Sequence, residues 1–145
     1  MKGFLLDTNI PSELTRPQPQ PSVSEWLDKA DDNQLCLSVV SLGEILKGIT
    51  ILPDSKRRKA LQQWLDETLR PWFDGRILPI NEAIAERWGI LAAQRQLKGE
   101  PLNMADGLIA ASALEHDLTI VTRNIRDFEG LEVDLFNPWV SDRNP

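Results

Sequence analysis

The sequence alternates between short runs of apolar residues and longer segments in which apolar residues recur every three or four positions. The short runs predict buried strands, and the longer segments predict helices with one apolar face. We expect strands at residues 4–6, 35–40, 76–78, 118–122 and 133–136, and helices at 10–14, 22–30, 41–52, 53–73, 82–97 and 103–116. Because strands and helices alternate, the pattern predicts an α/β fold with a mostly parallel sheet.

The first predicted strand ends at a carboxylate, Asp7, which is followed by Thr8 and Asn9. Residues 4–6 show no polar alternation, as is typical of a strand covered by helices on both faces. Ligands of open α/β sheets bind outside the carboxyl ends of the strands, so Asp7 is a candidate anchor for a metal or a phosphate. The alternative is that residues 7–9 only turn the chain and cap a helix with Pro11 in its first turn.

Two further acids stand at predicted helix starts. Glu44 follows Ser41 at the spacing of a capping box, just beyond the second predicted strand. Asp106 follows Asn103 by three positions, at the start of a helix whose body is small and apolar. Helix capping alone would explain either acid. Parallel crossovers nevertheless bring the carboxyl ends of the strands to one edge, where Asp7, Glu44 and Asp106 are expected to converge.

Converging carboxylates repel one another and raise one another's pKa unless a cation lies between them. The sequence holds one cysteine, Cys36, and one histidine, His116, so it offers no Cys or His cluster. Oxygen-only ligand sets favour Mg²⁺ or Mn²⁺ over zinc. The single histidine also argues against a Ser-His-Asp triad and against a metal-independent, histidine-driven ribonuclease.

The 145 residues, 41% of them hydrophobic and 26% charged, fit one globular domain over residues 1–145. No apolar run is long enough to cross a bilayer, and Met1-Lys2-Gly3 begins no signal-peptide pattern. We therefore expect a cytoplasmic protein without a membrane partner. The net charge of −6 argues against a general nucleic-acid-coating protein but permits a nuclease with an acidic site. The basic run at residues 56–59 is either a solvated helix face or a phosphate contact.

Four motifs of the sequence resemble the successive motifs of the PIN domain. They are Phe4-Leu5-Leu6-Asp7-Thr8-Asn9, Ser41-Leu42-Gly43-Glu44, Ala105-Asp106-Gly107-Leu108-Ile109-Ala110-Ala111 and Ile120-Val121-Thr122-Arg123-Asn124. Three further segments narrow the resemblance to the VapC/FitB branch, the toxins of type II toxin–antitoxin pairs: Arg16-Pro17, Gly75-Arg76-Ile77-Leu78-Pro79 and Phe136-Asn137-Pro138-Trp139. The match covers essentially the whole chain, in order and at family-like spacing.

The resemblance implies a PIN-like three-layer α/β/α sandwich and a metal-dependent ribonuclease. It implies that Mg²⁺ is held by Asp7, Glu44 and Asp106, and that hydrogen bonds from Thr8, Asn9 and Thr122 support the site. It also implies an RNA substrate, an antitoxin that blocks the acidic pocket, and a homodimer or larger toxin–antitoxin assembly. In-line attack by water needs no 2′-hydroxyl, so the expected products carry a 5′-phosphate and a 3′-hydroxyl.

One position departs from the family pattern. Many relatives carry a fourth acid where this chain has Asn124, and the nearest acid is Asp127. We expect Asn124 to orient water, with only Asp7, Glu44 and Asp106 binding the metal directly. Asp127 either reaches back toward the site or caps a local turn.

Two functions of other classes stay open at this point. A receiver-like phosphoacceptor domain would need a paired acid near the first strand and a lysine after a late strand, whereas Arg123 and Asn124 follow Thr122 here. A catalytically degenerate PIN domain would act only as a protein-binding regulator, and the missing fourth acid leaves room for it.

Overall fold

The fold is built on a parallel sheet. The structure is a computed structural model that describes the backbone of residues 2–143 and the side chains of residues 2–140. Within that range the strands are β1 (Phe4–Leu6), β2 (Leu35–Ser38), β3 (Ile77–Leu78), β4 (Thr119–Val121) and β5 (Leu135–Phe136). They lie in the order β3-β2-β1-β4-β5, and every pairing is parallel. The predicted parallel sheet is confirmed, with β1 at its centre.

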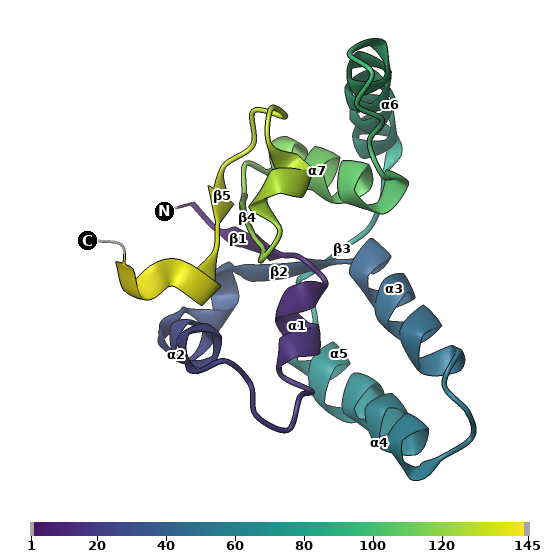
Figure 1. Ribbon diagram of the computed structural model, residues 1–145, viewed down its shortest axis with the longest axis vertical. Helices are drawn as coiled ribbons and strands as arrows, with labels where there is room; N and C mark the ends of the chain where they lie inside the picture. The colour runs from purple at the N-terminus through teal and green to yellow at the C-terminus, as the bar shows by residue number, and fades with distance from the viewer. Residues whose placement is uncertain (1, 144–145) are drawn as a thin grey trace.

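Helices cover both faces of this sheet (Figure 1). The α-helices are α1 (Asn9–Glu13), α2 (Pro21–Lys29), α3 (Val39–Thr50), α4 (Lys56–Trp64), α5 (Arg70–Trp72), α6 (Glu82–Leu97) and α7 (Met104–His116). Shorter elements are the 3₁₀-helices η1 (Asp32–Gln34), η3 (Ile125–Phe128) and η4 (Pro138–Arg143) and the π-helix η2 (Leu65–Leu69). Figure 1 shows α1 to α5 on one side of the sheet and α6 and α7 on the other.

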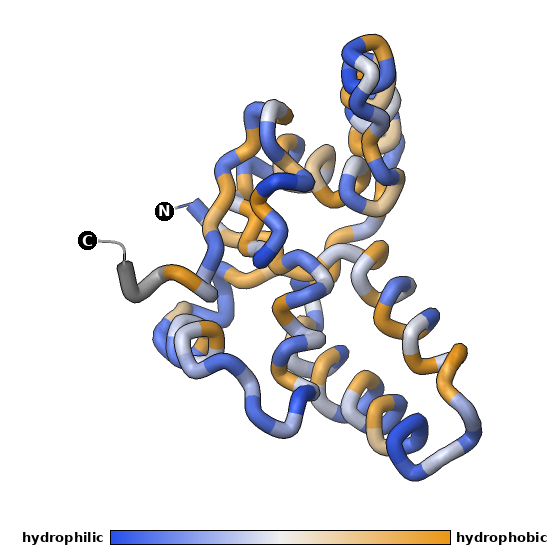
Figure 2. The backbone as a smooth tube through the Cα atoms, viewed as in Figure 1, coloured by the Kyte–Doolittle hydropathy of each residue, from blue (hydrophilic) through white to orange (hydrophobic). Residues whose placement is uncertain are grey.

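Successive residues of each strand contribute to opposite cores, because side chains of a strand alternate between its two faces. Leu6 and Val121 pack in the core beneath α1 to α4, and Leu5 and Ile120 pack in the core beneath α6 and α7. All four are fully buried, and each such side chain contributes about 1.5–3 kcal/mol relative to an exposed position. The strands are accordingly among the hydrophobic segments of the chain (Figure 2). The three-layer α/β/α sandwich expected from the sequence is confirmed.

The second predicted strand was wrong in length, and the start of the next helix was wrong by two residues. β2 ends at Ser38 and α3 begins at Val39, with the Ser38 hydroxyl accepting the N–H of Val40 at 3.0 Å. Pairing with β3 reaches only Ser38, so the chain is free to turn there. Ser41 is therefore inside the helix, and its spacing to Glu44 is not a capping box.

The long helix predicted over residues 53–73 is divided. It begins at Lys56, where the Ser55 hydroxyl accepts the N–H of Arg58 at 3.2 Å. The π-helix η2 interrupts it, and it ends at Trp72, one residue beyond Pro71. Among residues 2–143, none of the helices combines the length and the apolar character required to cross a membrane.

Candidate active site

Asp7 lies at the carboxyl end of the central strand. Its N–H donates to Val121 O at 2.9 Å, so the ladder with β4 continues to this residue, and the residue is only 6% exposed. The carboxylate accepts three hydrogen bonds, from the Thr122 hydroxyl at 2.8 Å, the Asn9 amide at 3.2 Å and the Thr8 N–H at 2.8 Å. These donors hold the carboxylate in one orientation at the sheet edge.

Thr8 connects the end of β1 to α3. Its hydroxyl donates to Glu44 Oε1 at 2.6 Å and lies 2.8 Å from the Ser41 hydroxyl. Since a hydroxyl carries one hydrogen, Ser41 donates to Thr8 when Thr8 donates to Glu44. Ser41 is a supporting residue that sequence reasoning missed. Its spacing of three from Glu44 was the available signal, because residues three apart lie on the same face of a helix.

Asn9 connects the same segment to the end of β4. Its side-chain oxygen accepts the N–H of Arg123 at 3.3 Å, and the Thr122 hydroxyl accepts the N–H of Asn124 at 2.9 Å. No side chain caps α1 at its N-cap residue, Thr8. The capping explanation for residues 7–9 is therefore wrong, since their side chains contact other elements instead.

Asp106 lies in the first turn of α7, where the Asn103 side chain accepts its N–H at 3.2 Å. The predicted cap is confirmed. Gly107 lets α7 approach α6 closely, since a Cβ there would come within 2.7 Å of the Trp88 ring. The first turn of α7, which carries Asp106, is thus packed closely against α6.

Burial and the charges of neighbouring carboxylates raise the pKa of two acids of the site, Asp106 and Asp7. Burial raises the pKa of Asp106 to about 6, with further contributions from the charges of Asp7, Asp127 and Glu44. Burial also raises the pKa of Asp7, and the charges of Glu44 and Asp127 add to that rise, whereas the hydrogen bonds from Thr122 and Thr8 lower it. Such mutual effects require that the four carboxylates lie near one another.

Asp127 lies in η3, the short turn after Asn124, and its N–H donates to Asn124 O at 3.0 Å. Its charge acts on both Asp7 and Asp106, so the turn brings this acid toward the site. Asn124 is exposed and its side chain makes no capping bond to η3.

The side chains at this edge offer oxygen donors, the kind of ligand that Mg²⁺ binds. In the part of the chain that the structure describes, no group of three or more His, Cys, Asp or Glu side chains is arranged so that it could hold a metal ion. Mg²⁺ is commonly bound by one or two carboxylates and keeps several waters, so it does not need a closed cage. The uncompensated negative charge of Asp7, Glu44 and Asp106 is the property that a divalent cation would neutralise.

Comparison with known proteins identifies the family of the chain. Residues 4–132, which contain every predicted site residue, match the PIN domain. The chain belongs to the PIN domain family. Within that family it is 38% identical over 136 residues to Toxin FitB of Neisseria gonorrhoeae, covering 94% of this chain and 98% of the relative. It is 35% identical over 136 residues to VapC ribonuclease Y4jK of Sinorhizobium fredii, covering 94% and 97%.

The fold of this PIN-domain chain is also found among solved structures. The crystal structure of FitAcB from Neisseria gonorrhoeae superposes with a TM-score of 0.88 at 37% identity, covering 94% of this chain and 99% of the other. The resemblance to the VapC/FitB branch that the motifs indicated is confirmed.

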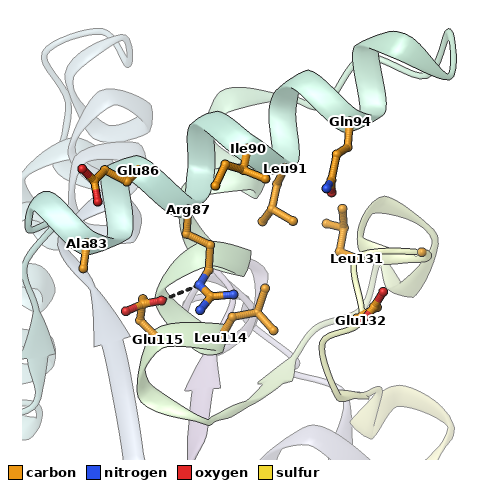
Figure 3. Close-up of a pocket in the computed structure, with 11 residues that line it drawn as sticks. Ala83, Glu86, Arg87, Ile90, Leu91, Gln94, Leu114, Glu115, Leu131 and Glu132 are labelled. Atoms are coloured by element: carbon orange, nitrogen blue, oxygen red, sulfur yellow. Dashed lines mark hydrogen bonds and ion pairs between the residues drawn. The ribbon is translucent and has the colours of Figure 1, made fainter.

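A groove of about 550 Å³ lies elsewhere on the PIN domain, between α6, the end of α7 and the segment after η3 (Figure 3). Ile90, Leu91 and Leu131 form its apolar part, and an ion pair between Arg87 and Glu115 crosses its floor. None of the predicted site residues lines it. The predicted site residues therefore lie outside this groove.

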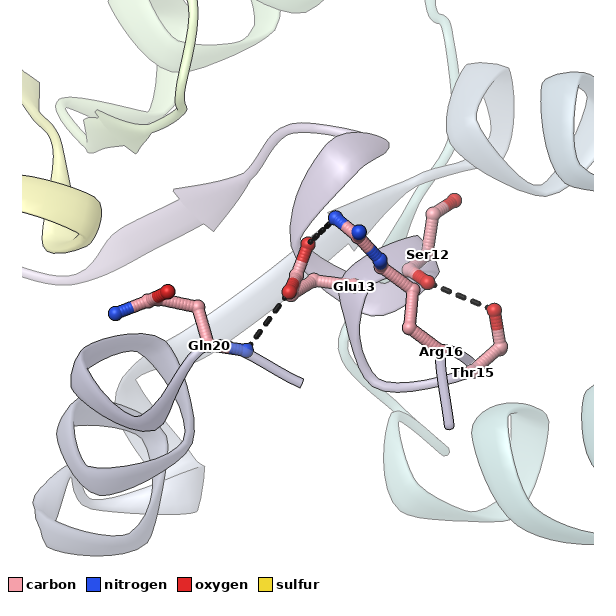
Figure 4. A network of polar contacts seen from close by, with 5 residues as sticks. All are labelled: Ser12, Glu13, Thr15, Arg16 and Gln20. Carbon is pink, nitrogen blue, oxygen red and sulfur yellow. Dashed lines mark hydrogen bonds and ion pairs between the residues drawn. The ribbon is translucent and has the colours of Figure 1, made fainter. Parts of the chain in front are cut away.

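Glu13, at the end of α1, is a buried acid that sequence reasoning did not single out. It is 5% exposed, and its carboxylate accepts the Gln20 N–H at 2.8 Å and the Arg16 guanidinium at 3.3 Å (Figure 4). The Thr15 hydroxyl donates to Ser12 O at 2.7 Å in the same network. These bonds fix the proline-rich loop that follows α1.

Proposed function

We propose that this PIN-domain chain is the ribonuclease toxin of a type II toxin–antitoxin pair, a metal-dependent endonuclease that hydrolyses RNA phosphodiester bonds. The observation that carries the proposal is the electrostatic coupling of Asp7, Glu44 and Asp106 at one edge of the sheet, the acidic edge. Burial raises the pKa of Asp106 to about 6, and the charges of Asp7 and Glu44 contribute to that rise. Such an arrangement is unfavourable for the apo protein and favourable for binding a cation. The similarity to Toxin FitB and to a VapC ribonuclease supports the same activity.

Asp7, Glu44 and Asp106 would hold Mg²⁺, or Mn²⁺ in its place. The chemistry that such an ion supplies is positive charge beside the scissile phosphate and activation of water for in-line attack. Thr122 and Asn9 keep the Asp7 carboxylate oriented through its Oδ2, and Thr8 does the same for Glu44. Asn124 orients water at the rim of the site, and Asp127 adds negative charge without binding the ion.

Hydrolysis at this site requires no 2′-hydroxyl nucleophile, so the products carry a 5′-phosphate and a 3′-hydroxyl. Because the acidic edge attracts cationic groups, the antitoxin presents an Arg or Lys side chain to it and blocks the carboxylates. Solved relatives of this chain include toxin–antitoxin complexes, some of them bound to DNA. We further propose a cytoplasmic location and a homodimer or larger toxin–antitoxin assembly.

The test is an RNA cleavage assay on the purified protein. Cleavage is expected with Mg²⁺ or Mn²⁺, none is expected with excess chelator, and none is expected from the Asp106→Asn variant. End analysis of the products distinguishes a 5′-phosphate from the cyclic phosphate of metal-independent ribonucleases. If the folded wild-type protein cleaves no RNA in either metal but binds its antitoxin, the chain is a degenerate PIN domain that acts as a regulator.

A further inference from the structure

Two adjoining hollows, together called the groove, lie between Glu44 and the start of α4. Its first part, about 180 Å³, includes Thr8 and Glu44 in its lining. Its second part, about 470 Å³, includes Lys56 and Arg57. Three residues line both parts and join them: Thr15, Leu61 and Trp64. From Glu44 to the last α3 residue of the lining, Ile49, the groove follows α3 for about 7.5 Å.

The two cations at the far end are free to bind an anion. Lys56 and Arg57 are exposed, and neither takes part in an ion pair with any residue between 2 and 140. Arg58, in contrast, is turned away, and its guanidinium donates to Leu52 O at 3.3 Å. Lys59 is exposed on the same helix but does not line the groove. In a chain of net charge −6, this is a local basic site next to an acidic one.

We infer that the groove holds the RNA strand beside the scissile phosphate, with Lys56 and Arg57 binding its phosphates. The inference rests on the proposed ribonuclease function. Charge complementarity favours this occupant, because the RNA backbone is a row of anions and both cations lie in the groove that opens at Glu44. The basic antitoxin segment proposed above is repelled at this end of the groove. Within the basic run of residues 56–59, Lys56 and Arg57 thus bind phosphates, whereas Arg58 and Lys59 do not.

The test compares Lys56→Gln, Arg57→Gln and the double variant with Lys59→Gln as the matched control. Both groove positions are in the first turn of α4, where loss of positive charge favours the helix dipole, so the variants are expected to fold. The double variant should raise KM for single-stranded RNA about tenfold with kcat unchanged. It should also reduce the slope of log KM against log salt by about 1.4, or about 0.7 for each phosphate that the protein no longer neutralises. Lys59→Gln should change neither quantity.

A binding measurement separates this inference from the proposed function. Fluorescence anisotropy of a labelled single-stranded RNA, in the Asp106→Asn background, reports affinity without cleavage. If the wild type cleaves RNA and the double variant matches Lys59→Gln in KM, salt slope and affinity, the groove is not an RNA site and the ribonuclease proposal stands. If the wild type cleaves no RNA, the proposed function fails, and equal RNA affinities of the variants would then overturn the groove assignment too. Lost affinity for an acidic protein segment, with RNA binding unchanged, would also overturn it.

Discussion

The hydroxyl of Thr122 donates a hydrogen bond of 2.8 Å to Oδ2 of Asp7, and both residues are buried at the ends of neighbouring strands. The same hydroxyl oxygen accepts the N–H of Asn124 at 2.9 Å. One threonine therefore stabilises the ionised form of the innermost carboxylate and also fixes the backbone that leads into η3. Its position connects the charge of Asp7 to the geometry of the segment that carries Asp127.

Replacing Thr122 by Val keeps the shape of the side chain but removes this hydroxyl. We expect the variant to lose about 1–3 kcal/mol in free energy of unfolding, because a buried carboxylate and a backbone N–H each lose a partner. The pKa of Asp7 should rise further, so the acidic limb of the pH–activity profile should move to higher pH. Urea unfolding and a pH–rate profile measure the two effects. Thr122→Ser keeps the hydroxyl and is the control for the pH profile, which it should leave unchanged, although loss of the buried methyl group lowers the free energy of unfolding by about 1 kcal/mol. Equal pH profiles for the Val and Ser variants would contradict the role of the hydroxyl.

Asp7→Asn, Glu44→Gln and Asp106→Asn should each abolish RNA cleavage while leaving the fold intact. Each substitution removes a charged ligand but creates no cavity, so cation affinity falls and packing survives. Thermal melts should show that Mg²⁺ raises the Tm of the wild type and that the rise disappears in the variants. A folded Asp106→Asn protein that cleaves RNA at the wild-type rate would contradict the site assignment.

The raised pKa of Asp106 predicts how the stability of the metal-free protein depends on pH. In the folded state the pKa is about 6, above the ordinary value of 3.8, so between these values the folded chain binds more protons than the unfolded chain. The free energy of unfolding should therefore fall as pH rises from about 4 to about 6, by on the order of 1–2 kcal/mol after solvent screening. The buried Asp7 carboxyl, whose pKa is also raised, adds to the same trend.

Asp106→Asn removes that titration, so it should be more stable than the wild type at pH 7 in chelator and nearly equal to it at pH 4. Urea unfolding at four pH values measures the difference between the two proteins, which cancels the titration of the other carboxylates. A stability difference that is the same at pH 4 and pH 7 would show that Asp106 does not titrate as described.

The fourth acidic position is tested by a pair of variants. Asn124→Asp adds a carboxylate at the end of β4 and should lower the Mg²⁺ concentration needed for half-maximal activity, whereas Asp127→Asn should change it little. The wild type, with fewer fixed charges, is expected to need Mg²⁺ in the millimolar range or to prefer Mn²⁺. A metal titration of cleavage compares the three proteins. If Asp127→Asn is as inactive as Asp7→Asn, then Asp127 is a metal ligand and Asn124 has no role beside it.

The fold and the acidic edge could be predicted because each depends on a pattern within a short stretch of sequence. Apolar runs marked the strands, and parallel crossovers then place Asp7 and Glu44 at one edge regardless of the exact helix boundaries. The start of α3 could not be predicted, because Ser38 and Ser41 are both competent caps. The choice between them depends on where pairing with β3 ends, which is a contact between residues about 40 positions apart.

Dependence on residues that are distant in the sequence also explains other features that the sequence did not predict. The hydrogen bond between Thr8 and Ser41 joins residues 33 positions apart. The spacing of Ser41 to Glu44 places both on one face of a helix, but it does not indicate that Thr8 is their partner. The π-helix η2 adds one residue per turn to an otherwise regular apolar spacing, so Leu61, Leu65 and Leu69 gave no sign of it. Glu13 could not be predicted to be a buried acid, because its burial depends on hydrogen bonds from Gln20 and Arg16. Only the folded loop brings these donors to the Glu13 carboxylate.

Residues 7–9 are three consecutive positions whose side chains reach α3 and the end of β4, up to 115 positions further along the chain. The segment leaves the ribosome long before its partners at residues 122 and 123, which are among the last of the fold to be made. A nascent chain that ends before β4 therefore carries an Asp7 without its orienting hydroxyl and lacks the central pairing of β1 with β4. Translation of this protein thus delays assembly of the acidic edge until β4 has been made.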